Sequence, residues 1–381
     1  MSGHEEELPG ISLGISEAVA RRRFGMSRAE FLRRAAAVSV AAPLASGGGG
    51  VAMAESSATT LRMINYINWI GKTEIADFKR RTGVGVKQIV VNDGPERVTK
   101  IATDPSSVDL VLMDLTSAGP LDDHGLLAKL DWSKIPNYKN VPAHYKQYQF
   151  SEKKALGMVS DFGRTSFVYR TDIVKENLRS WHDVWRVAPK YSGKIVFIDS
   201  VNDTMSAALA VRGHNINSRV ASEITDARNA LIGIKPHLHS VSSANALQPL
   251  LNGSAAIAMD WDFDAAAVLP KHPKIPLKWV DAEDTMYAYL EGWGAVKGTK
   301  VLPQVQQFMN NHLDPKVYAQ FVNTLSISNL MPAALNFVLP SVVKSPVLNV
   351  TPNAGKHIVF GTSHGEAQKL WDRAWAEFKS A

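Results

Sequence analysis

Apolar and polar positions along this chain alternate with two different periods. Residues 84–91 and 108–113 are short, nearly continuous apolar runs, which is the pattern of strands buried on both faces. Residues 73–82 instead place apolar side chains at helical spacing and end in basic residues before a glycine, as helices do. Strand-like and helix-like segments follow one another in turn, which predicts an α/β protein with a largely parallel sheet.

The same rhythm starts again after about residue 161. We expect further strands at residues 61–70, 165–169, 194–199, 255–259 and 286–296, the last of which would cross back between two parts of the molecule. Helices are predicted at residues 95–101, 122–129, 180–187, 203–214, 224–238, 302–312, 315–324 and 365–379. With 381 residues the chain is long enough for two domains with separate cores.

The stretch at residues 255–264 places charge beside aromatic rings at the end of an apolar run. The chemically notable side chains that end this strand are Asp260, Trp261, Asp262 and Asp264. Ligands of open α/β sheets bind at the carboxyl ends of strands, and a ring face beside a carboxylate suits an organic cation. Two alternatives stay open: Asp264 as the N-cap of a following helix, and Trp261 as a core side chain.

Residues 1–54 have the composition of an export signal. Six arginines precede a mildly apolar, alanine-rich segment at residues 35–46, and Ala52-Met53-Ala54 is a small-x-small cleavage pattern. We therefore expect a signal peptide cleaved after Ala54 and a mature protein in the periplasm. Residues 27–33 resemble a twin-arginine signal but carry Ala29 where the second arginine would stand, so the twin-arginine and general export routes both stay open.

Composition narrows the possible functions. The formal net charge of +6 is spread along the chain without a run of five basic residues, which argues against a nucleic-acid partner. The chain has no cysteine, so disulfides, thiolate nucleophiles and cysteine-ligated zinc are excluded. We expect no metal and no cofactor, because His237 and His239 have strand-type spacing but no acidic residue beside them.

One catalytic motif is matched, but incompletely. Residues 361–365, Gly-Thr-Ser-His-Gly, fit the nucleophile elbow of a serine hydrolase around Ser363. In that fold the catalytic acid and base follow the serine, yet no histidine lies beyond His364. A turn before the last helix is the favoured interpretation, and an exported hydrolase is kept as an alternative. Because phosphate-binding, dinucleotide-binding and zinc-protease motifs are absent from the sequence, we predict a binding protein and no enzyme.

Several short motifs occur in the order and spacing of a known family. Residues 65–69 are Asn-Tyr-Ile-Asn-Trp after the first strand, and residues 81–86 form a helix–Thr-Gly–strand turn. Residues 180–185 are Ser-Trp-His-Asp-Val-Trp, and Tyr-Ser-Gly-Lys follows at residues 191–194. Together with the strand at residues 108–111, these motifs make the mature chain resemble the periplasmic spermidine/putrescine-binding proteins of ABC importers.

The resemblance implies a fold, a function and partners. The fold is the two-lobed periplasmic binding protein fold (type II), in which each lobe is a mixed sheet flanked by helices and the ligand lies in the interlobe cleft. Lobe one would comprise residues 58–163 and 292–334, and lobe two residues 164–291 and 335–381. The implied function is binding of a putrescine- or spermidine-class cation, without catalysis or cofactor, by a monomer that delivers it to an inner-membrane ABC permease.

The family's site positions can be carried over one residue at a time. The resemblance implies aromatic walls for the ligand's methylene groups, carboxylates for its ammonium groups and one polar residue in the cleft. The corresponding residues are Tyr66, Trp69, Asp114, Asp203, Ser243, Trp261, Tyr289 and Glu291. The structural alternatives are core packing for the aromatic residues and a helix N-cap for Asp203.

Departures from the family pattern leave the ligand open. Ile67 stands at a hydroxyl position, Asp114 and Thr116 stand where the family has a serine and a tyrosine, and Ser200 stands where it has a carboxylate, with Asp199 adjacent. A different amine, an amino acid derivative or an anion therefore remains an alternative ligand. An anion would need an arginine, and the candidate is Arg164.

Overall fold

The computed structural model describes residues 59–91, 94–146, 156–350 and 354–381. The predicted signal peptide, with its cleavage site and its twin-arginine-like stretch, lies outside these residues. None of the helices in the described ranges combines the length and the apolar character needed to cross a membrane. The part of the chain from Ser57 to Ala381 forms one compact unit.

The first half of the sheet has the strand order β2-β1-β3-β9-β4. Strand β1 runs parallel to β2 and β3, whereas β9 runs antiparallel to both β3 and β4. The strands are β1 (Thr60–Tyr66), β2 (Gly85–Val91), β3 (Leu110–Asp114), β4 (Gly157–Arg170) and β9 (Met286–Ala295). The helices of this half are α3 (Lys72–Thr82), α4 (Gly94–Thr103), α5 (Leu115–Asp123), α6 (Ala143–Lys146), α12 (Leu302–His312) and α13 (Pro315–Leu325).

The second half continues from β4 in the order β4-β7-β5-β6, while β8 pairs with β4 and β10 with β9. Its further strands are β5 (Ile195–Phe197), β6 (Leu238–Val241), β7 (Ile257–Trp261), β8 (Leu277–Val280) and β10 (Ile358–Phe360). Its helices are α7 (Trp181–Val187), α8 (Val201–Val211), α9 (Ala221–Ile234), α10 (Gln248–Leu251), α11 (Asp262–Val268), α14 (Pro340–Val343) and α15 (Gln368–Ser380).

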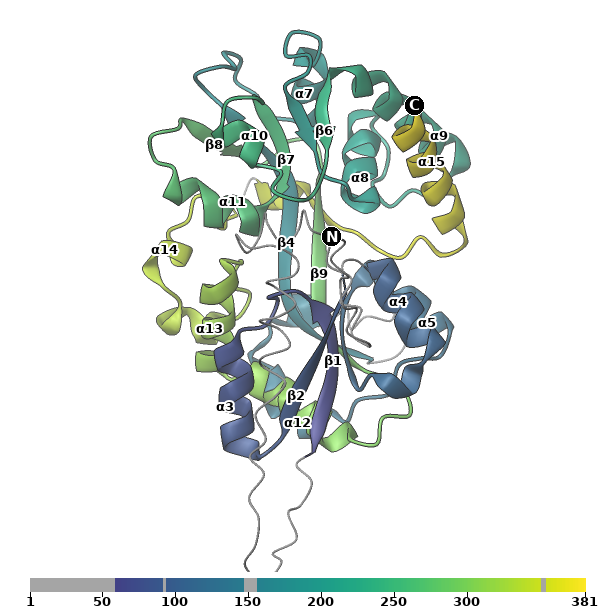
Figure 1. The fold of residues 1–381 in the computed structure, drawn as a ribbon, viewed down its shortest axis with the longest axis vertical. Coiled ribbons are helices and arrows are strands. Elements are labelled where there is room, and N and C mark those ends of the chain that lie inside the picture. Colours follow the sequence, from purple (N-terminus) through teal and green to yellow (C-terminus); the bar gives the residue numbers. More distant parts are fainter. Residues whose placement is uncertain (1–58, 92–93, 147–155, 351–353) are drawn as a thin grey trace, which may run out of the picture. The chain divides into compact units, whose positions relative to one another are not determined.

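Strands β4 and β9 connect the two halves, and Figure 1 shows them side by side through the middle of the described unit. Residues 157–164 of β4 pair with β9, and residues 165–169 pair with β7. Strand β9 likewise pairs with β3 at its carboxyl end and with β10 at its start. The molecule therefore has two lobes that share two continuous strands.

The sheet is mixed, as the family resemblance implied, and not largely parallel, as the rhythm of strands and helices predicted. Parallel pairs occur within each lobe, as βαβ connections require. The two crossing strands are antiparallel to each other and to their neighbours β3 and β7. The early rhythm of strands and helices predicted the parallel pairs, but strand order across a lobe boundary leaves no local trace in the sequence.

Two predicted helices depart furthest from their expected bounds. The helix expected at residues 122–129 lies earlier, at Leu115–Asp123, because the Asp114 carboxylate caps it through the backbone N–H groups of Thr116 and Ser117. The helix expected at residues 224–238 ends at Ile234, and a turn containing Pro236 leads into β6. In both places the apolar period continued past a boundary that capping or proline chemistry determines.

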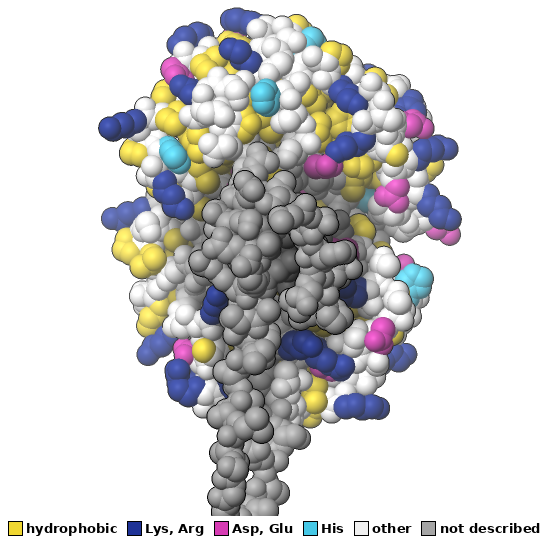
Figure 2. Space-filling view, in the orientation of Figure 1, with side chains coloured by type: hydrophobic (Ala, Val, Ile, Leu, Met, Phe, Trp, Pro, Cys, Tyr) yellow, Lys and Arg dark blue, Asp and Glu magenta, His cyan; other side chains and the backbone are white. Residues whose placement is uncertain are grey.

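Surface charge on the face drawn in Figure 2 is dispersed. The dark-blue Lys and Arg side chains lie over both lobes and do not gather in one patch. Nucleic-acid binding usually needs a continuous basic patch or stripe, and the described residues visible on this face do not form one.

Trp293 on β9 anchors the core of the first lobe. Its side chain is fully buried and packs edge-on against Phe308 and His312, with ring centroids 5.9 Å and 6.0 Å away. Replacing Trp293 with Ala should lower the free energy of unfolding by about 3–5 kcal/mol, because the ring leaves a cavity. Chemical denaturation measures this. The control Phe337→Ala, at a side chain that is 45% exposed, should change it by only about 0.5 kcal/mol.

Candidate functional site

Three carboxylates lie side by side where β3, β9 and β4 pair. Glu291 of β9 is the direct cross-strand partner of Asp114 on β3 and of Asp161 on β4. Direct partners in an antiparallel pair point to the same face of the sheet. Asp161 is fully buried and Glu291 is 6% exposed. Neither oxygen of Asp161, nor Oε2 of Glu291, has a hydrogen-bond partner.

Burial and mutual repulsion change the proton affinities of these carboxylates. Burial raises the pKa of the Asp161 carboxyl to about 7. Burial also raises the pKa of Glu291 well above its ordinary value, and the charges of Asp161 and Asp114 add to this effect. The two carboxyl groups are therefore hard to ionise together at neutral pH.

Asp114 has a cationic partner, unlike the other two carboxylates. Nη2 of Arg97, on α4, lies 2.8 Å from Asp114 Oδ2 and donates also to Ser117 Oγ at 2.8 Å. Burial alone would raise the pKa of Asp114, but the Arg97 charge and the hydrogen bonds from Thr116 and Ser117 outweigh burial and lower that pKa. Arg97 itself is fully buried, 5.0 Å above the ring of Tyr66, and its Nε and Nη1 groups have no partner.

Asp203 of the second lobe accepts hydrogen bonds from three side chains. Its Oδ1 accepts from Thr165 Oγ1 and from Trp261 Nε1 at 3.2 Å, and its Oδ2 accepts from Ser200 Oγ. Burial raises the pKa of Asp203, and these hydrogen bonds oppose the increase. Helix α8 begins at Val201 with Ser200 at the N-cap position, so the interpretation of Asp203 as an N-cap is wrong.

The acidic and aromatic residues at positions 260–264, which are adjacent in sequence, point in different directions at the end of β7. Trp261 pairs opposite Thr165, and both contact Asp203, whereas the alternation of a strand turns Asp260 to the other face. Helix α11 begins at Asp262 with Trp261 at its N-cap position, so Asp264 lies in the first turn and its interpretation as the N-cap is wrong.

Aromatic rings from both lobes meet beside these carboxylates. Trp69, in the loop after β1, contacts Tyr66 and Phe263 with ring centroids 6.1 Å and 5.8 Å apart. Phe263, on α11, stacks on Trp261 at 5.8 Å with planes 9° apart. Trp69 is 8% exposed and its buried Nε1 has no partner. Core contacts therefore account for one side of Trp69, while its polar edge is left unsatisfied.

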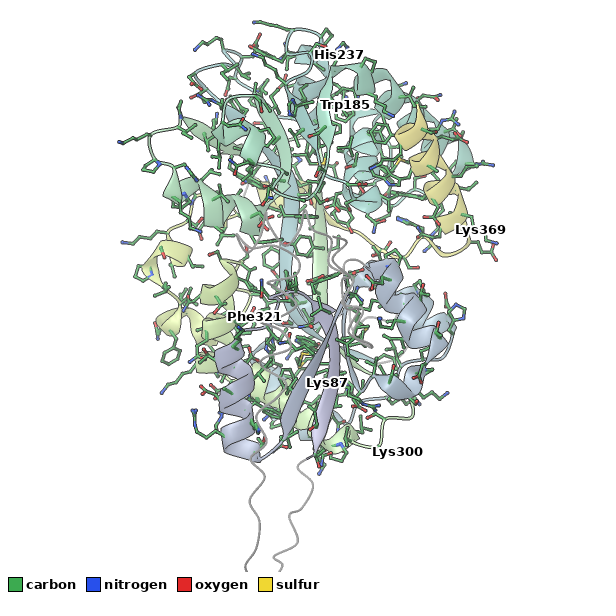
Figure 3. The ribbon with its side chains drawn as sticks, viewed as in Figure 1. Lys87, Trp185, His237, Lys300, Phe321 and Lys369 are labelled. Carbon is green, nitrogen blue, oxygen red and sulfur yellow. The ribbon has the colours of Figure 1, made fainter. Side chains whose placement is uncertain are left out.

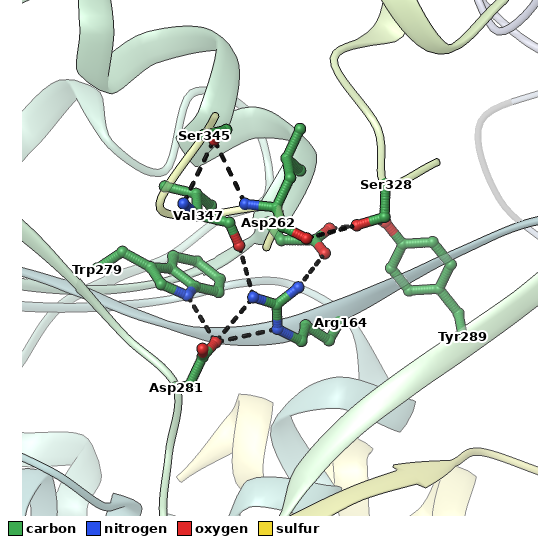
Figure 4. Close-up of polar contacts among 9 residues, drawn as sticks. Arg164, Asp262, Trp279, Asp281, Tyr289, Ser328, Ser345 and Val347 are labelled. Atoms are coloured by element: carbon green, nitrogen blue, oxygen red, sulfur yellow. Dashed lines mark hydrogen bonds and ion pairs between the residues drawn. The ribbon is translucent and has the colours of Figure 1, made fainter. Parts of the chain in front are cut away.

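Tyr289 and Arg164 belong to a second polar group, drawn in Figure 4. Arg164 Nε and Nη2 donate to Asp281 Oδ1 at 3.0 and 2.9 Å, Nη1 donates to Asp262 Oδ2 at 3.0 Å, and Nη2 also donates to the carbonyl of Val347. Tyr289 Oη donates to Asp262 Oδ1 at 3.4 Å. Burial raises the pKa of Asp262 to about 6 against the opposing charge of Arg164. All three guanidinium nitrogens of Arg164 thus have partners within the protein. Arg164 is therefore not available to bind an anionic ligand, as the sequence analysis had considered.

Four further candidates named from the sequence are Ser243, Asp199, Ile67 and Thr116. Ser243 follows β6, and its buried Oγ has no hydrogen-bond partner. Asp199 is directed to the surface, where Lys379 Nζ lies 2.6 Å from Oδ2, so it does not replace the carboxylate missing at Ser200. Ile67 is 40% exposed. Thr116 accepts from Asn202 Nδ2 at 3.4 Å, a contact between the lobes.

The histidines considered as metal ligands and the residues of the hydrolase-like motif form hydrogen bonds within the protein. His237 lies at the far end of the second lobe (Figure 3) and bonds to Ser192, and His239 bonds to the Gly193 carbonyl. Ser363 Oγ accepts from the Gly365 N–H, while His364 Nε2 lies 3.2 Å from Asn202 Oδ1. In the described ranges no group of three or more His, Asp or Glu side chains is arranged to hold a metal ion.

Sequence reasoning missed Asp161 and Arg97. A single acidic residue inside the apolar run of β4 was the available signal for Asp161, since buried charges are rare without a function or partner. Arg97 shares the buried face of α4 with Ile101, but its neighbours in sequence are polar, and no sequence pattern separates it from a solvated arginine. Only the packing of α4 against α5 and β2 brings it to Asp114.

Comparisons with known proteins agree on one family. A family model described as bacterial extracellular solute-binding protein matches residues 74–350. The spermidine/putrescine-binding periplasmic protein of Escherichia coli K12 is 21% identical over 323 residues, which cover 84% of this chain and 92% of that protein. The putrescine-binding periplasmic protein PotF of the same organism is 23% identical over 340 residues, covering 84% and 91%.

A solved structure shares the fold. The spermidine/putrescine ABC transporter substrate-binding protein PotD of Streptococcus pneumoniae superposes with a TM-score of 0.73 at 18% identity, covering 84% of this chain and 99% of that one. The matches confirm the resemblance and the two-lobed fold inferred from the sequence motifs.

The Arg97–Asp114 pair gives a direct test of the site's electrostatics. Arg97→Met should lower the free energy of unfolding by about 3 kcal/mol, because it leaves the Asp114 carboxylate without its counter-charge. Adding Asp114→Asn should restore part of that loss. A double-mutant cycle by urea denaturation measures the coupling. In the control, Arg212→Met removes an exposed pair with Asp226 and should cost about 1 kcal/mol or less. Simple additivity of the Arg97 and Asp114 changes would contradict the pairing.

Proposed function

Because the chain belongs to the bacterial extracellular solute-binding protein family, we propose that it is the periplasmic solute-binding component of an ABC importer. Its ligand is an organic cation of the putrescine and spermidine class, held between the two lobes. The relatives named for spermidine and putrescine binding support this ligand class, although their identity to this chain is 21–23%. The protein acts as a monomer and presents its closed form to an inner-membrane permease.

The observation that carries the proposal is an excess of buried carboxylates where the lobes meet. Arg97 pairs with Asp114 and Arg164 with Asp262. In the described part of the chain, no Lys or Arg forms an ion pair with the carboxylates of Asp161, Asp203 and Glu291, all of them buried. A buried charge is stable only with a partner or a proton. A ligand carrying two or more ammonium groups supplies the missing charge.

The aromatic residues complete the recognition of a flexible amine. Ring faces attract ammonium groups, and their flat surfaces pack against methylene groups. Tyr66 and Trp69 come from the first lobe, Trp261 from the second, and Tyr289 from the crossing strand β9. We propose these residues, with Asp114, Asp203, Ser243 and Glu291, as the ligand-binding set.

The lobe boundaries fit a closing motion. We propose that lobe one comprises residues 58–163 and 292–334, and lobe two residues 164–291 and 335–381, with closure about β4 and β9. The change of partner strand along β4, from β9 to β7 after residue 164, supports the first boundary. Export to the periplasm would use residues 1–54, in line with the periplasmic names of the relatives.

A second ligand class is favoured by one feature. The buried Nε and Nη1 groups of Arg97 lack partners and could donate to a carboxylate. A ligand that carries both an amine and a carboxylate, such as a small amino acid derivative, would satisfy Arg97 and Glu291 together. Ser363 supports no hydrolase, because its neighbour His364 stacks on Trp371 at 3.8 Å and bonds to Asn202 instead.

Thermal unfolding of the protein with a ligand panel distinguishes these classes. The panel contains putrescine, spermidine, spermine, 4-aminobutyrate, amino acids, choline and sugars. A ligand at about 100 times its Kd stabilises the folded state by about 2.7 kcal/mol, which raises Tm by several degrees. We expect the polyamines to raise Tm. A shift with amino acids alone would overturn the polyamine proposal in favour of the second class.

The charge partners can be removed together. The double variant Asp203→Ala/Glu291→Ala should lower polyamine affinity by at least about 100-fold, since removing one partner of a buried charge pair costs 2–5 kcal/mol. Isothermal calorimetry measures this, and circular dichroism checks the fold. Asp199→Ala is the matched control, because it removes an exposed carboxylate in the same lobe. Unchanged affinity in the double variant would contradict the site.

A further inference from the structure

Asp161 and Glu291 face each other on the two crossing strands. They are direct cross-strand partners, and such partners have Cβ atoms about 4.5–5.5 Å apart. Asp161 is fully buried with both oxygens unpartnered, and Glu291 has Oε2 unpartnered. On the same strand face, the Tyr289 hydroxyl lies where a Cβ on Gly163 would be, so this ring covers β4 beside the pair. The pair is thus enclosed by the sheet and by an aromatic side chain.

Neither neighbouring arginine forms an ion pair with Asp161 or Glu291. Arg97 is held by Asp114 and Ser117, and Arg164 by Asp262 and Asp281. His312 Nδ1 lies 2.8 Å from Glu74 Oε1, and its Nε2 lies 2.7 Å from Ser160 Oγ. The titratable and charged groups that interact with the pair, from every element packed against it, are Tyr66 on β1, Asp114 on β3, Arg97 on α4, Tyr287 and Tyr289 on β9, Asp262 on α11, His312 on α12 and Tyr318 on α13.

Two buried like charges at this separation require either a proton or an external cation. We propose that Asp161 and Glu291 hold one proton between them in the ligand-free protein, and that a primary ammonium group of the ligand displaces it and binds between the two carboxylates. The displaced proton passes to solvent, and one N–H···O contact to each carboxylate replaces the shared O–H. The inference rests on the proposed function, because it requires an amine ligand.

The inference makes Asp161 a specificity-determining residue. A primary ammonium has three N–H donors and can satisfy the free oxygens of both side chains. A quaternary ammonium such as choline has no N–H donor and would leave those buried oxygens unsatisfied. The pKa of about 7 at Asp161 and the raised pKa of Glu291, both caused first by burial, agree with a proton that leaves near neutral pH.

Calorimetry of putrescine and spermidine binding measures the displaced proton. The titrations are run at pH 6.5 in two buffers that differ in ionisation enthalpy, with the purified protein. Wild type should release about half to one proton per ligand bound. The ligand does not contribute, because its amines, like that of lysine, titrate near pH 10. Asp161→Asn should release at least twofold fewer protons and bind at least tenfold more weakly. Asp199→Asn makes the same change in charge at the surface and should match wild type.

The pH dependence has a definite sign. Below the midpoint of the pair, wild-type affinity should rise by up to about tenfold per pH unit, since one proton competes with the ligand. Without ligand, a folded-state pKa above the unfolded value stabilises the protein at low pH, and this stabilisation is lost as pH rises through about 7. Between pH 5 and pH 8, Tm of wild type should therefore fall relative to Tm of Asp161→Asn.

The outcomes separate this inference from the proposed function. Amine binding without proton release would contradict the inference that the ligand displaces a proton, but it would leave the proposed function of polyamine binding intact. If choline bound as tightly as putrescine, the inference that a primary ammonium group binds between Asp161 and Glu291 would be wrong. A wild-type protein that binds no amine at all would contradict the proposed function, and the displacement with it. Equal pH slopes of Tm in wild type and Asp161→Asn, without ligand, would show that Asp161 holds no proton.

Discussion

The register of β9 between β3 and β4 is the constraint on which the rest of the site depends. It places Glu291 opposite Asp114 on one side and Asp161 on the other. Three carboxylates in one buried row oppose folding unless each has a proton or a cation. Arg97 neutralises one of them, and the other two are left for protons or a ligand. A cation bound here, as we propose, would relieve the repulsion between these carboxylates, which would link stability and binding through the same side chains.

The crossing strands also determine how closely the lobes can pack. Gly163 on β4 has no side chain, and the Tyr289 hydroxyl takes up the space that a Cβ would need. Tyr289 can then reach Asp262 on α11, which Arg164 holds in turn. The two crossing strands, about which we propose that the lobes close, therefore also carry Tyr289, Asp161 and Glu291 of the proposed site. Any motion of one lobe about these strands moves the groups that would contact a ligand.

Arg97 explains how the chain accommodates a departure from the family pattern. Asp114 stands at a position where the resemblance implies a serine, and an unpaired carboxylate there would add to the repulsion around Glu291. Arg97 supplies the compensating charge and lies 5.0 Å above the Tyr66 ring, where an ammonium group would otherwise find a favourable face. Arg97 thus occupies a place beside Asp114 and Tyr66 that a ligand ammonium group could otherwise take. Fewer positions are therefore left for the ligand's ammonium groups.

The sequence by itself determined the two lobes, the family and most of the secondary structure. Helix α12 matches its predicted bounds and α13 nearly does, because the apolar period and an early proline agree in both helices and Asp314 caps the start of α13. The resemblance also pointed to Tyr66, Tyr289 and Glu291 as site residues, and the fold places both tyrosines close enough to Glu291 for its charge to act on them. Local patterns carry this information, since helix ends, strand periods and short motifs are set by neighbouring residues.

Only the tertiary structure decided which charges are compensated. Asp114 and Asp203 have the same side chain and the same predicted role. Packing gives Asp114 an arginine from α4, whereas it gives Asp203 three neutral donors from three different segments. Asp161 was overlooked because its importance comes from a partner 130 residues away on an antiparallel strand. The register between distant strands and the burial of side chains determine the electrostatics of a site. Neither can be predicted from the spacing of residues along one segment.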